Sequence, residues 1–339
     1  LVQGNYRHGI VSKDSLEVTG GTLTVEALAD GLRGRDEVTI GGGTLAIDAG
    51  SDGIQSNNNE DPERGTVQIE GGQITIEAGF DGIQAATDVI ISGGTLSIRT
   101  GGGSPDSIAV ETGMGRMPFA ASTEEASPSR KGIKADGSVQ ISGGELAIDA
   151  ADDALHANGA VKVTGGTLAL ASGDDAIHAD ESIAIDGAEI VISQSYEGLE
   201  SANITLAGGT VRITAADDGV NIVAPADQGG AVGWSSPGQA SASGRLLAIS
   251  GGYLAVDAQG DGFDINGSVT MTGGTVLIHG PASDGNGALD YDGSFCQSGG
   301  LLMAVGSAGM AMAPDSTSTQ PAVLVMLPET QQAGTPIHI

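Results

Sequence analysis

Two short acidic motifs, in neighbouring stretches of the chain, are nearly identical. Residues 152–157 are Asp-Asp-Ala-Leu-His-Ala, and residues 174–179 are Asp-Asp-Ala-Ile-His-Ala. Ca²⁺ is a hard cation that takes about six to eight oxygen ligands, which carboxylates on successive turns of a chain can supply. His156 and His178 add imidazole nitrogens, which suit transition metals. The motif therefore predicts cation chemistry, provided that the fold brings its copies together.

The core of the motif is an acidic residue followed by Gly or Ala and then an aliphatic residue, and it recurs along most of the chain. If the repeats stack in register, these carboxylates form one column. Like charges about 5 Å apart repel by roughly 1 kcal/mol in water and by more beside an apolar wall. Only His8 and Lys131 interrupt the series.

The sequence therefore predicts Ca²⁺ as a cofactor, held first by the doubled pairs and then by the single acids. The predicted ligands are Asp152, Asp153, Asp174, Asp175, Asp217, Asp218, Asp30, Asp52, Asp81 and Asp261. The alternative is that Asp-Gly is ordinary turn chemistry, with solvated charges and no metal.

The two histidines fall in a second predicted column, which faces outward. Stacked imidazoles beside aspartates are one way to bind a transition metal. The other members of this column share no chemistry: Arg33, Gln55, Gln84, Lys134, Glu200, Asn221 and Asp264. The sequence therefore favours a solvated face over a transition-metal site.

The repeat that carries both columns has a period of about 22 residues, a length typical of solenoid units. Five of the steps between successive Gly-Gly pairs, or their Gly187-Ala188 equivalent, are equal, as from Gly21 to Gly43. Segments such as 22–27 and 167–171 alternate polar and apolar residues, which indicates short strands with one buried face. A unit of this size cannot bury its aliphatic face alone and must stack on its neighbours. The sequence predicts an all-β fold, a right-handed parallel β-helix of roughly 11 coils.

Residues 1–339 are expected to form a single β-helix domain whose repeat is interrupted by three inserted loops. Residues 57–65 are a short acidic loop, and residues 101–130 and 224–245 are longer and rich in Gly, Ser and Pro. Insertions between solenoid coils often line the binding surface. The alternative is that they only decorate it.

The charge composition limits which classes of partner the protein can bind. The chain has 13 basic and 43 acidic residues, a formal net charge of −30. This balance excludes a phosphate-binding surface, so nucleic acid is not expected as a partner, and anionic membrane surfaces are disfavoured for the same reason. The single cysteine, Cys296, excludes a disulfide framework and is expected to be a small buried side chain.

Three functional classes stay open on the residues alone. Many parallel β-helices cleave acidic polysaccharides with aspartate-bound Ca²⁺ and an arginine base, and Arg33, Arg99 and Arg212 are the candidates here. A repeat that copies its acidic residues into every coil suits multivalent binding better than a single active site. The third class is structural: a stalk, or a subunit that self-associates end to end through unpaired strand edges.

Four stretches resemble the clostridial-type β-helix carbohydrate-binding domain family. They are residues 4–36 (GNYRHGIVSKDSLEVTGGTLTVEALADGLRGRD), 50–85 (GSDGIQSNNNEDPERGTVQIEGGQITIEAGFDGIQA), 130–150 (RKGIKADGSVQISGGELAIDA) and 285–300 (GNGALDYDGSFCQSGG). The resemblance implies a pectate-lyase-like fold without the catalytic centre, and so no enzyme activity. It also implies bound calcium, a secreted or surface-attached bacterial protein, and binding to plant cell-wall polysaccharides such as cellulose and pectic acid.

The family usually has further strands before residue 4 and a further segment after Ile339, so the chain is expected to be a fragment. A polyanion such as polygalacturonate would be repelled by a charge of −30 unless Ca²⁺ bridged carboxylates of both partners. Calcium bridging is therefore the mechanism expected for an acidic glycan. A neutral glucan would instead need aromatic platforms, for which Trp234, Tyr196 and Tyr253 are the candidates.

Overall fold

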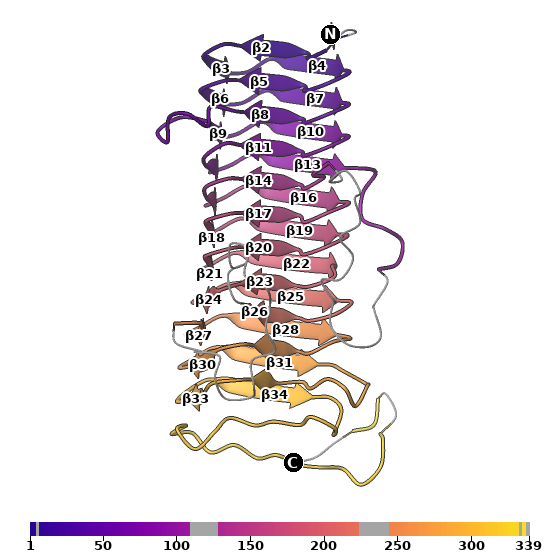
Figure 1. The fold of residues 1–339 in the computed structure, drawn as a ribbon, viewed down its shortest axis with the longest axis vertical. Coiled ribbons are helices and arrows are strands. Elements are labelled where there is room, and N and C mark those ends of the chain that lie inside the picture. Colours follow the sequence, from indigo (N-terminus) through magenta and orange to yellow (C-terminus); the bar gives the residue numbers. More distant parts are fainter. Residues whose placement is uncertain (5–6, 109–127, 224–243, 332–333, 337–339) are drawn as a thin grey trace.

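The computed structural model describes residues 1–4, 7–108, 128–223, 244–331 and 334–336. They form one elongated solenoid of short parallel strands, with the first strands at one end and the C-terminal segment at the other (Figure 1). The described residues contain no helix, and so none that is long and apolar enough to cross a membrane. The prediction of an all-β parallel β-helix is confirmed.

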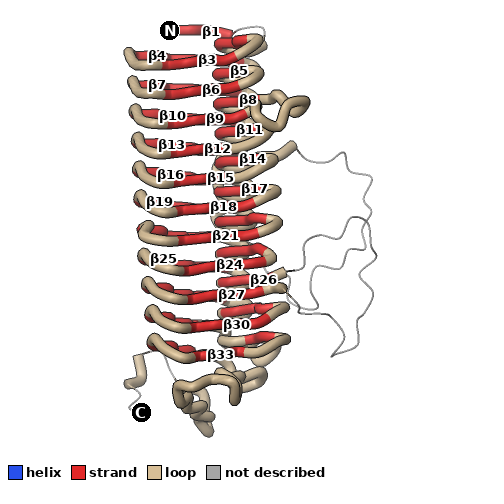
Figure 2. Tube along the Cα trace, turned by 90° about the vertical axis from the view of Figure 1, so that its left-hand side faces the viewer, coloured by secondary structure: helices blue, strands red, loops and turns tan. Residues whose placement is uncertain are grey.

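Three parallel sheets enclose the core, and Figure 2 shows how their strands stack as successive coils. The first, called here the long-strand sheet, has 12 strands, most of them six residues long. In spatial order they are β1 (Val2–Gly4), β4 (Thr22–Ala27), β7 (Thr44–Ala49), β10 (Gln73–Ala78), β13 (Thr95–Thr100), β16 (Glu145–Ala150), β19 (Thr167–Ser172), β22 (Glu189–Gln194), β25 (Thr210–Ala215), β28 (Tyr253–Ala258), β31 (Thr275–His279) and β34 (Leu301–Val305).

The other two sheets have 11 strands each. The short-strand sheet contains β2 (Ile10–Ser12), β5 (Leu32–Gly34), β8 (Ile54–Ser56), β11 (Ile83–Ala85), β14 (Ile133–Ala135), β17 (Leu155–Ala157), β20 (Ile177–Ala179), β23 (Leu199–Ser201), β26 (Val220–Ile222), β29 (Phe263–Ile265) and β32 (Asp290–Tyr291). The third sheet contains β3 (Ser15–Val18), β6 (Glu37–Ile40), β9 (Thr66–Ile69), β12 (Val89–Ile91), β15 (Val139–Ile141), β18 (Ala160–Val163), β21 (Ser182–Ile185), β24 (Asn203–Leu206), β27 (Leu246–Ile249), β30 (Ser268–Met271) and β33 (Phe295–Gln297).

The strands of neighbouring coils pair in the register that the repeat predicts. Thr22 aligns with Thr44, and Glu145 aligns with Thr167, each exactly one repeat further along the chain. Longer steps occur where the inserted loops leave the solenoid: Thr44 aligns with Gln73 around loop 57–65. The other two insertions follow β13 and β26 in the sequence, and residues 109–127 and 224–243 of them lie outside the described residues. Equivalent positions therefore stack over one another along the solenoid.

Aliphatic side chains that point inward from all three sheets fill the interior. In β7, Leu45 and Ile47 are buried while Thr44 and Ala46 are exposed, which is the period-two pattern of the sequence. The same positions of successive coils pack on one another, so that Ile76 lies between Ile47 and Ile98. A coil alone would leave these side chains in water, and stacking removes them from it.

The Gly-Gly turns that mark the repeat have the backbone geometry that their sequence predicts. In these pairs the second glycine has φ between +77° and +105°, a region that other L-residues rarely adopt. Crowding between coils adds a second reason: a Cβ at Gly43 would lie 2.8 Å from the carbonyl oxygen of Gly21 in the preceding coil. Glycine is therefore required here both by the turn and by the stacking distance.

The C-terminal segment covers one edge of the last coil. Its Asp315 donates its N–H to the carbonyl oxygen of Phe295 at 3.0 Å and accepts the Phe295 N–H on Oδ2 at 2.9 Å. Ser318 accepts the N–H of Gln297 at 2.9 Å. The edge of β33 is thus paired, whereas β34 is the outermost strand of the long-strand sheet among the described residues.

Cys296 differs from its predicted position. It is the central residue of β33 and is half-buried, with its Sγ 3.4 Å from the carbonyl oxygen of Thr317. The two residues beside it, Phe295 and Gln297, are the buried ones. The prediction of a buried cysteine was wrong because the alternation of this strand places a glutamine, not the cysteine, on the inner face.

Candidate functional site

One acidic residue lies in the turn before most strands of the short-strand sheet, and these residues stack into the acidic column: Asp30, Asp52, Asp81, Asp153, Asp175, Glu197, Asp218 and Asp261. The backbone sets their stacking, because the residue after each acid donates its N–H to the carbonyl oxygen of the equivalent residue in the next coil, which in most coils is the next acid. Gly31 does so to Asp52, and Gly219 to Asp261, both at 2.9 Å. Lys131 fills the position between Asp81 and Asp153.

One carboxylate oxygen of several column acids has a structural partner in the next coil. Asp52 Oδ1 accepts the N–H of Asp81 at 3.1 Å. Asp153 Oδ1 accepts the N–H of Asp175 at 3.2 Å, and Asp218 Oδ1 accepts that of Asp261 at 2.6 Å. These contacts satisfy backbone donors between coils. The aspartates thus have a role in the fold that needs no metal.

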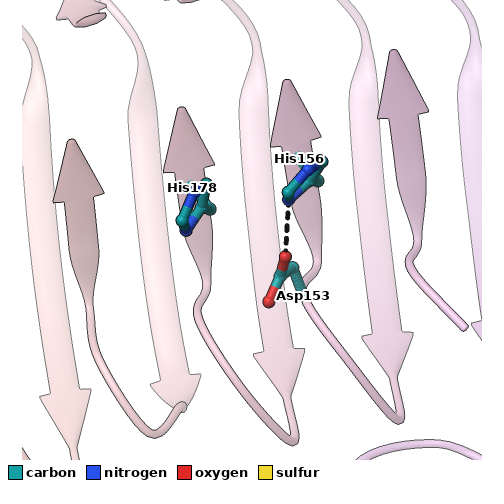
Figure 3. A group of neighbouring side chains, drawn as sticks. All are labelled: Asp153, His156 and His178. Carbon is teal, nitrogen blue, oxygen red and sulfur yellow. Dashed lines mark hydrogen bonds and ion pairs between the residues drawn. The ribbon is translucent and has the colours of Figure 1, made fainter. Parts of the chain in front are cut away.

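The second oxygen faces the residue three positions later, the central residue of the following short strand, called here the partner position. Asp30 Oδ2 lies 3.4 Å from the Arg33 guanidinium, and Asp52 Oδ2 accepts from Gln55 Nε2 at 2.5 Å. Figure 3 shows the equivalent contact between Asp153 and His156, 2.8 Å long, with His178 beside them on the next coil. His178 Nδ1 in turn lies 3.0 Å from Asp175 Oδ2.

From Glu197 onward the partner position no longer supplies a cation. It holds Glu200 after Glu197, Asn221 after Asp218, and Asp264 after Asp261. Asn221 donates its Nδ2 to Glu197 Oε2 at 2.7 Å rather than to Asp218. The acids of these coils therefore face further carboxylates.

The acids that face other carboxylates have raised pKa values. Burial, with repulsion from Asp264 and Asp217, raises the pKa of Asp218 to about 8. Burial and the charges of Asp261 and Asp290 raise the pKa of Asp264 to about 7, and burial also raises the pKa of Asp261 to about 6. Without a cation, this cluster binds protons near neutral pH.

Earlier coils show the effect of a donor or cation at the same place. Burial alone would raise the pKa of Asp153, but the hydrogen bond from His156 and the Lys131 ammonium, 2.6 Å away, hold it below its ordinary value. Asp52 has only the neutral Gln55, so burial and the charges of Asp81 and Asp30 raise its pKa to about 7.

Four groups of side chains within the described residues have ligand atoms close enough to hold one metal ion, each set lying within 4.8 Å. Two contain only carboxylates: Asp152, Asp153 and Asp174, and separately Asp218, Asp261 and Asp264. The other two contain histidine: Asp153, His156 and His178, and separately Asp175, His178 and Glu200. Of the predicted calcium ligands, Asp30, Asp52, Asp81 and Asp217 belong to none of these groups in the described part of the chain.

A family model described as "Carbohydrate-binding domain-containing protein" matches residues 1–176 of this chain, just over half of its 339 residues. The chain belongs to this family. Neither the comparison with curated proteins nor the comparison with solved structures found a match. The matched region covers the coils from β1 through β19, includes the first histidine-bearing motif and ends within the second.

The aromatic residues predicted to contact glycan do not form one platform. Trp234 lies outside the described residues. Tyr253, at the start of β28, has the Arg212 guanidinium 4.9 Å above its ring centre. Burial and a hydrogen bond to Asp217 raise the pKa of Tyr196, which places this ring beside the acidic column. Tyr196 follows β22 whereas Tyr253 begins β28, so the two rings lie at opposite ends of the long strands.

A groove of about 390 Å³ lies beside loop 57–65, which projects from the solenoid next to β9 (Figure 1). The loop is held by Asn58, whose Nδ2 donates to Asp36 at 2.7 Å, and by an ion pair between Arg35 and Glu60. The groove is lined by Asn59, Asp61, Pro62, Ala86, Thr87, Asp88, Asp136 and Gly137. Sequence reasoning identified the loop but not this groove, because Asp88 and Asp136 come from coils that only the fold brings beside it.

Proposed function

We propose that this chain is a non-catalytic, calcium-stabilised β-helix that binds acidic plant cell-wall polysaccharide outside a bacterial cell. Membership of a carbohydrate-binding domain family is the observation that carries the binding function. The carboxylate-only group of Asp218, Asp261 and Asp264 supports the calcium part of the proposal. Oxygen ligands alone suit Ca²⁺. The raised pKa values of all three carboxyls indicate that their negative charges repel one another and would be stabilised by a cation.

Calcium at this group would also provide the route to an acidic glycan. Its three members are only half-buried, so one side of a bound ion would stay open to solvent. Ca²⁺ has more coordination positions than three carboxylates fill. Uronate oxygens would take the open positions, and the ion would offset the repulsion between two polyanions.

The surroundings favour an acidic glycan over a neutral glucan. Arg212 covers one face of Tyr253, and Tyr196 lies at the opposite end of the long strands with its hydroxyl bonded to Asp217, so the two rings do not form one platform of the kind that stacks on glucose. The groove beside loop 57–65 has three carboxylates in its lining, Asp61, Asp88 and Asp136. Such a groove suits a cation-bridged polyanion better than a bare sugar face.

The candidate arginines of a lyase are already engaged. Arg33 contacts Asp30 at 3.4 Å, and Arg99 contacts Asp149 at 3.1 Å. Arg212 lies over Tyr253. A guanidinium held in an ion pair or over a ring is not positioned to reach a substrate proton as a general base. These contacts support binding without cleavage.

The test is affinity electrophoresis of the chain in gels that contain polygalacturonate, with calcium or with chelator. We expect retardation only with calcium, and a clear loss of it in Asp264→Asn. Asp48→Asn is the charge-matched control, because Asp48 is exposed on β7, far from the cluster. Retardation that survives chelation, equal loss in both variants, retention by cellulose alone, or release of unsaturated uronates would contradict the proposal.

End-to-end self-association is a second candidate function. The outermost strand β34 exposes three apolar side chains, Leu301, Met303 and Val305, each about half accessible. An open strand edge with apolar residues favours pairing with another copy. Sedimentation velocity tests this: species well above 33.4 kDa that disappear in Met303→Lys would support it, and a monomer at all concentrations would exclude it.

A further inference from the structure

We propose that Asp175, His178 and Glu200 form a site for a divalent transition-metal ion, with Zn²⁺ as its probe, distinct from the calcium cluster. The sequence favoured a solvated face at these positions. The fold changes that interpretation, because it joins one imidazole to two carboxylates whose ligand atoms lie within 4.8 Å of one another.

The three ligands are held by paired strands. His178 is the central residue of β20 and Glu200 the central residue of β23, and the two are aligned in register. His178 Nδ1 lies 3.0 Å from Asp175 Oδ2 and 3.5 Å from Glu200 Oε1. Both oxygens therefore converge on the same ring nitrogen. A metal ion at that point would take the place of a proton on Nδ1 and bind all three atoms.

A second, independent observation lies on the next coil. Asn221 aligns with Glu200 on β26, is 5 % exposed, and donates its Nδ2 to Glu197. Its Oδ1 is buried and has no hydrogen-bond partner among the described residues. A buried acceptor without a partner is costly, and this one belongs to a residue that is bonded to Glu197 and aligned with Glu200. A cation, with the water that it carries, would supply what this acceptor lacks.

The neighbouring histidine group is a weaker candidate for a metal. Asp153 already has the Lys131 ammonium at 2.6 Å and His156 Nδ1 at 2.8 Å. The imidazoles of His156 and His178 are stacked, 4.9 Å apart and inclined by 18°. A metal binds in the plane of an imidazole, so nearly parallel rings cannot both point at one ion. The ion is therefore assigned to His178 alone.

Nitrogen ligation separates this site from calcium. Ca²⁺ takes oxygen ligands, whereas an imidazole with carboxylates suits Zn²⁺ and its neighbours in the first transition series. An excess of calcium should consequently fill the oxygen-only group and leave this one available.

The experiment is calorimetric titration of Zn²⁺ into the chelator-stripped full chain in excess calcium. The variants are His178→Gln and Glu200→Gln, and the matched control is His156→Gln, which removes the stacked imidazole one coil away. Co²⁺ substitution gives a second readout, since its visible spectrum reports nitrogen and oxygen ligation.

We expect one tight Zn²⁺ in the wild-type chain. Both ligand variants should weaken it by roughly tenfold or more, the scale seen even for groups that only orient a ligand, while His156→Gln changes it by less than about threefold. If His178→Gln fails to fold, Glu200→Gln on the neighbouring strand decides. No Zn²⁺ uptake in excess calcium, or the same loss in His156→Gln as in His178→Gln, would overturn the assignment.

Discussion

The two halves of the acidic column have the same backbone ladder but different residues at the partner position. In the first half, from Asp30 to Asp175, the partner position supplies donors such as Arg33, Gln55 and His156. In the second half, from Glu197 to Asp261, it supplies Glu200 and Asp264, which are acids themselves. Burial of the column acids alone therefore does not decide whether a coil needs a cation.

The two carboxylate oxygens of a column acid have different roles, one in the fold and one in charge balance. The Oδ1 contacts to the next coil occur in both halves, for Asp52 as for Asp218, and serve the fold. In the first half Arg33 and His156 face the Oδ2 of Asp30 and Asp153, although burial still raises the pKa of Asp52 to about 7 and that of Asp175 to about 8. In the second half the acids face further carboxylates. Calcium binding is thus expected first at Asp218, Asp261 and Asp264 in the second half, although the motif looks alike in both.

The largest expected contrast is between Asp153→Asn and Asp218→Asn in chelator. An asparagine oxygen can still accept the backbone N–H in either coil. Asp153→Asn leaves His156 without this carboxylate and leaves Lys131 with Asp152 alone, 3.2 Å away, and breaking a buried pair costs up to about 3–5 kcal/mol. Asp218→Asn removes a repelled charge and should leave the unfolding free energy unchanged or higher. Urea denaturation measures both, and equal losses would show that the halves do not differ.

A pH series of melting temperatures sharpens the comparison. The folded-state pKa values of Asp52 and Asp264 are about 7 and that of Asp218 is about 8, all above the ordinary value of 3.8. Stability from these protonated carboxyls is therefore fully present below about pH 4 and lost as the pH rises through 7 to 8. Metal-free protein should melt at lower temperature at pH 8 than at pH 5.

Calcium should remove most of this fall, because the ion takes the place of the protons at Asp218 and Asp264. A melting temperature that rises from pH 5 to pH 8 in chelator would contradict the assigned pKa directions. A fall that is the same with and without calcium would leave the ion no role at these groups.

Exchanging the residues at the partner positions of Asp52 and Asp261 should exchange their effects on stability. Asp264→Gln copies Gln55 and should stabilise the metal-free protein by about 1 kcal/mol, the repulsion of two charges near 5 Å, while reducing the gain from calcium. Gln55→Asp should do the reverse beside Asp52. Paired denaturation curves with and without calcium test this exchange, and changes of the same sign in both variants would refute it.

The smallest expected effect is at an ion pair outside the column. Arg99 and Asp149 pair at 3.1 Å on the exposed face of the long-strand sheet. Exposed pairs contribute about 0.2–1 kcal/mol, so Arg99→Ala should lower stability by no more than that, and the loss should shrink in high salt. A loss as large as that of Asp153→Asn would mean that surface charges matter as much as the column.

Much of the fold could be predicted from the sequence because its signals are local and repeated. Alternation in residues 22–27 and the Gly-Gly turns both reflect one coil, and a constant step between repeats is enough to stack the coils. The stacking of Asp153 on Asp175 follows directly. Cys296 shows the limit, since the inner face of a single short strand depends on which of its residues the neighbours can accommodate.

The site was less predictable because it depends on contacts between coils. The three-residue spacing from Asp175 to His178 was visible, but nothing in it showed that Glu200 would converge on the same nitrogen. Asp264 was assigned to an outward column with no common chemistry, although the fold places it with Asp218 and Asp261. The direction of each carboxylate oxygen depends on a donor in another coil, which a single-strand pattern does not contain.

Calorimetric titration of Ca²⁺ into chelator-stripped protein at pH 8 tests the central claim most directly, with the wild-type chain compared to Asp264→Asn and Asp48→Asn. If the carboxylates around Asp264 bind Ca²⁺, the wild type and Asp48→Asn should both take up the ion and melt at a higher temperature with it. Asp264→Asn should take up Ca²⁺ much more weakly. No uptake by the wild type, or equal uptake by all three, would contradict it and leave the aspartates as turn residues whose function is the backbone ladder alone.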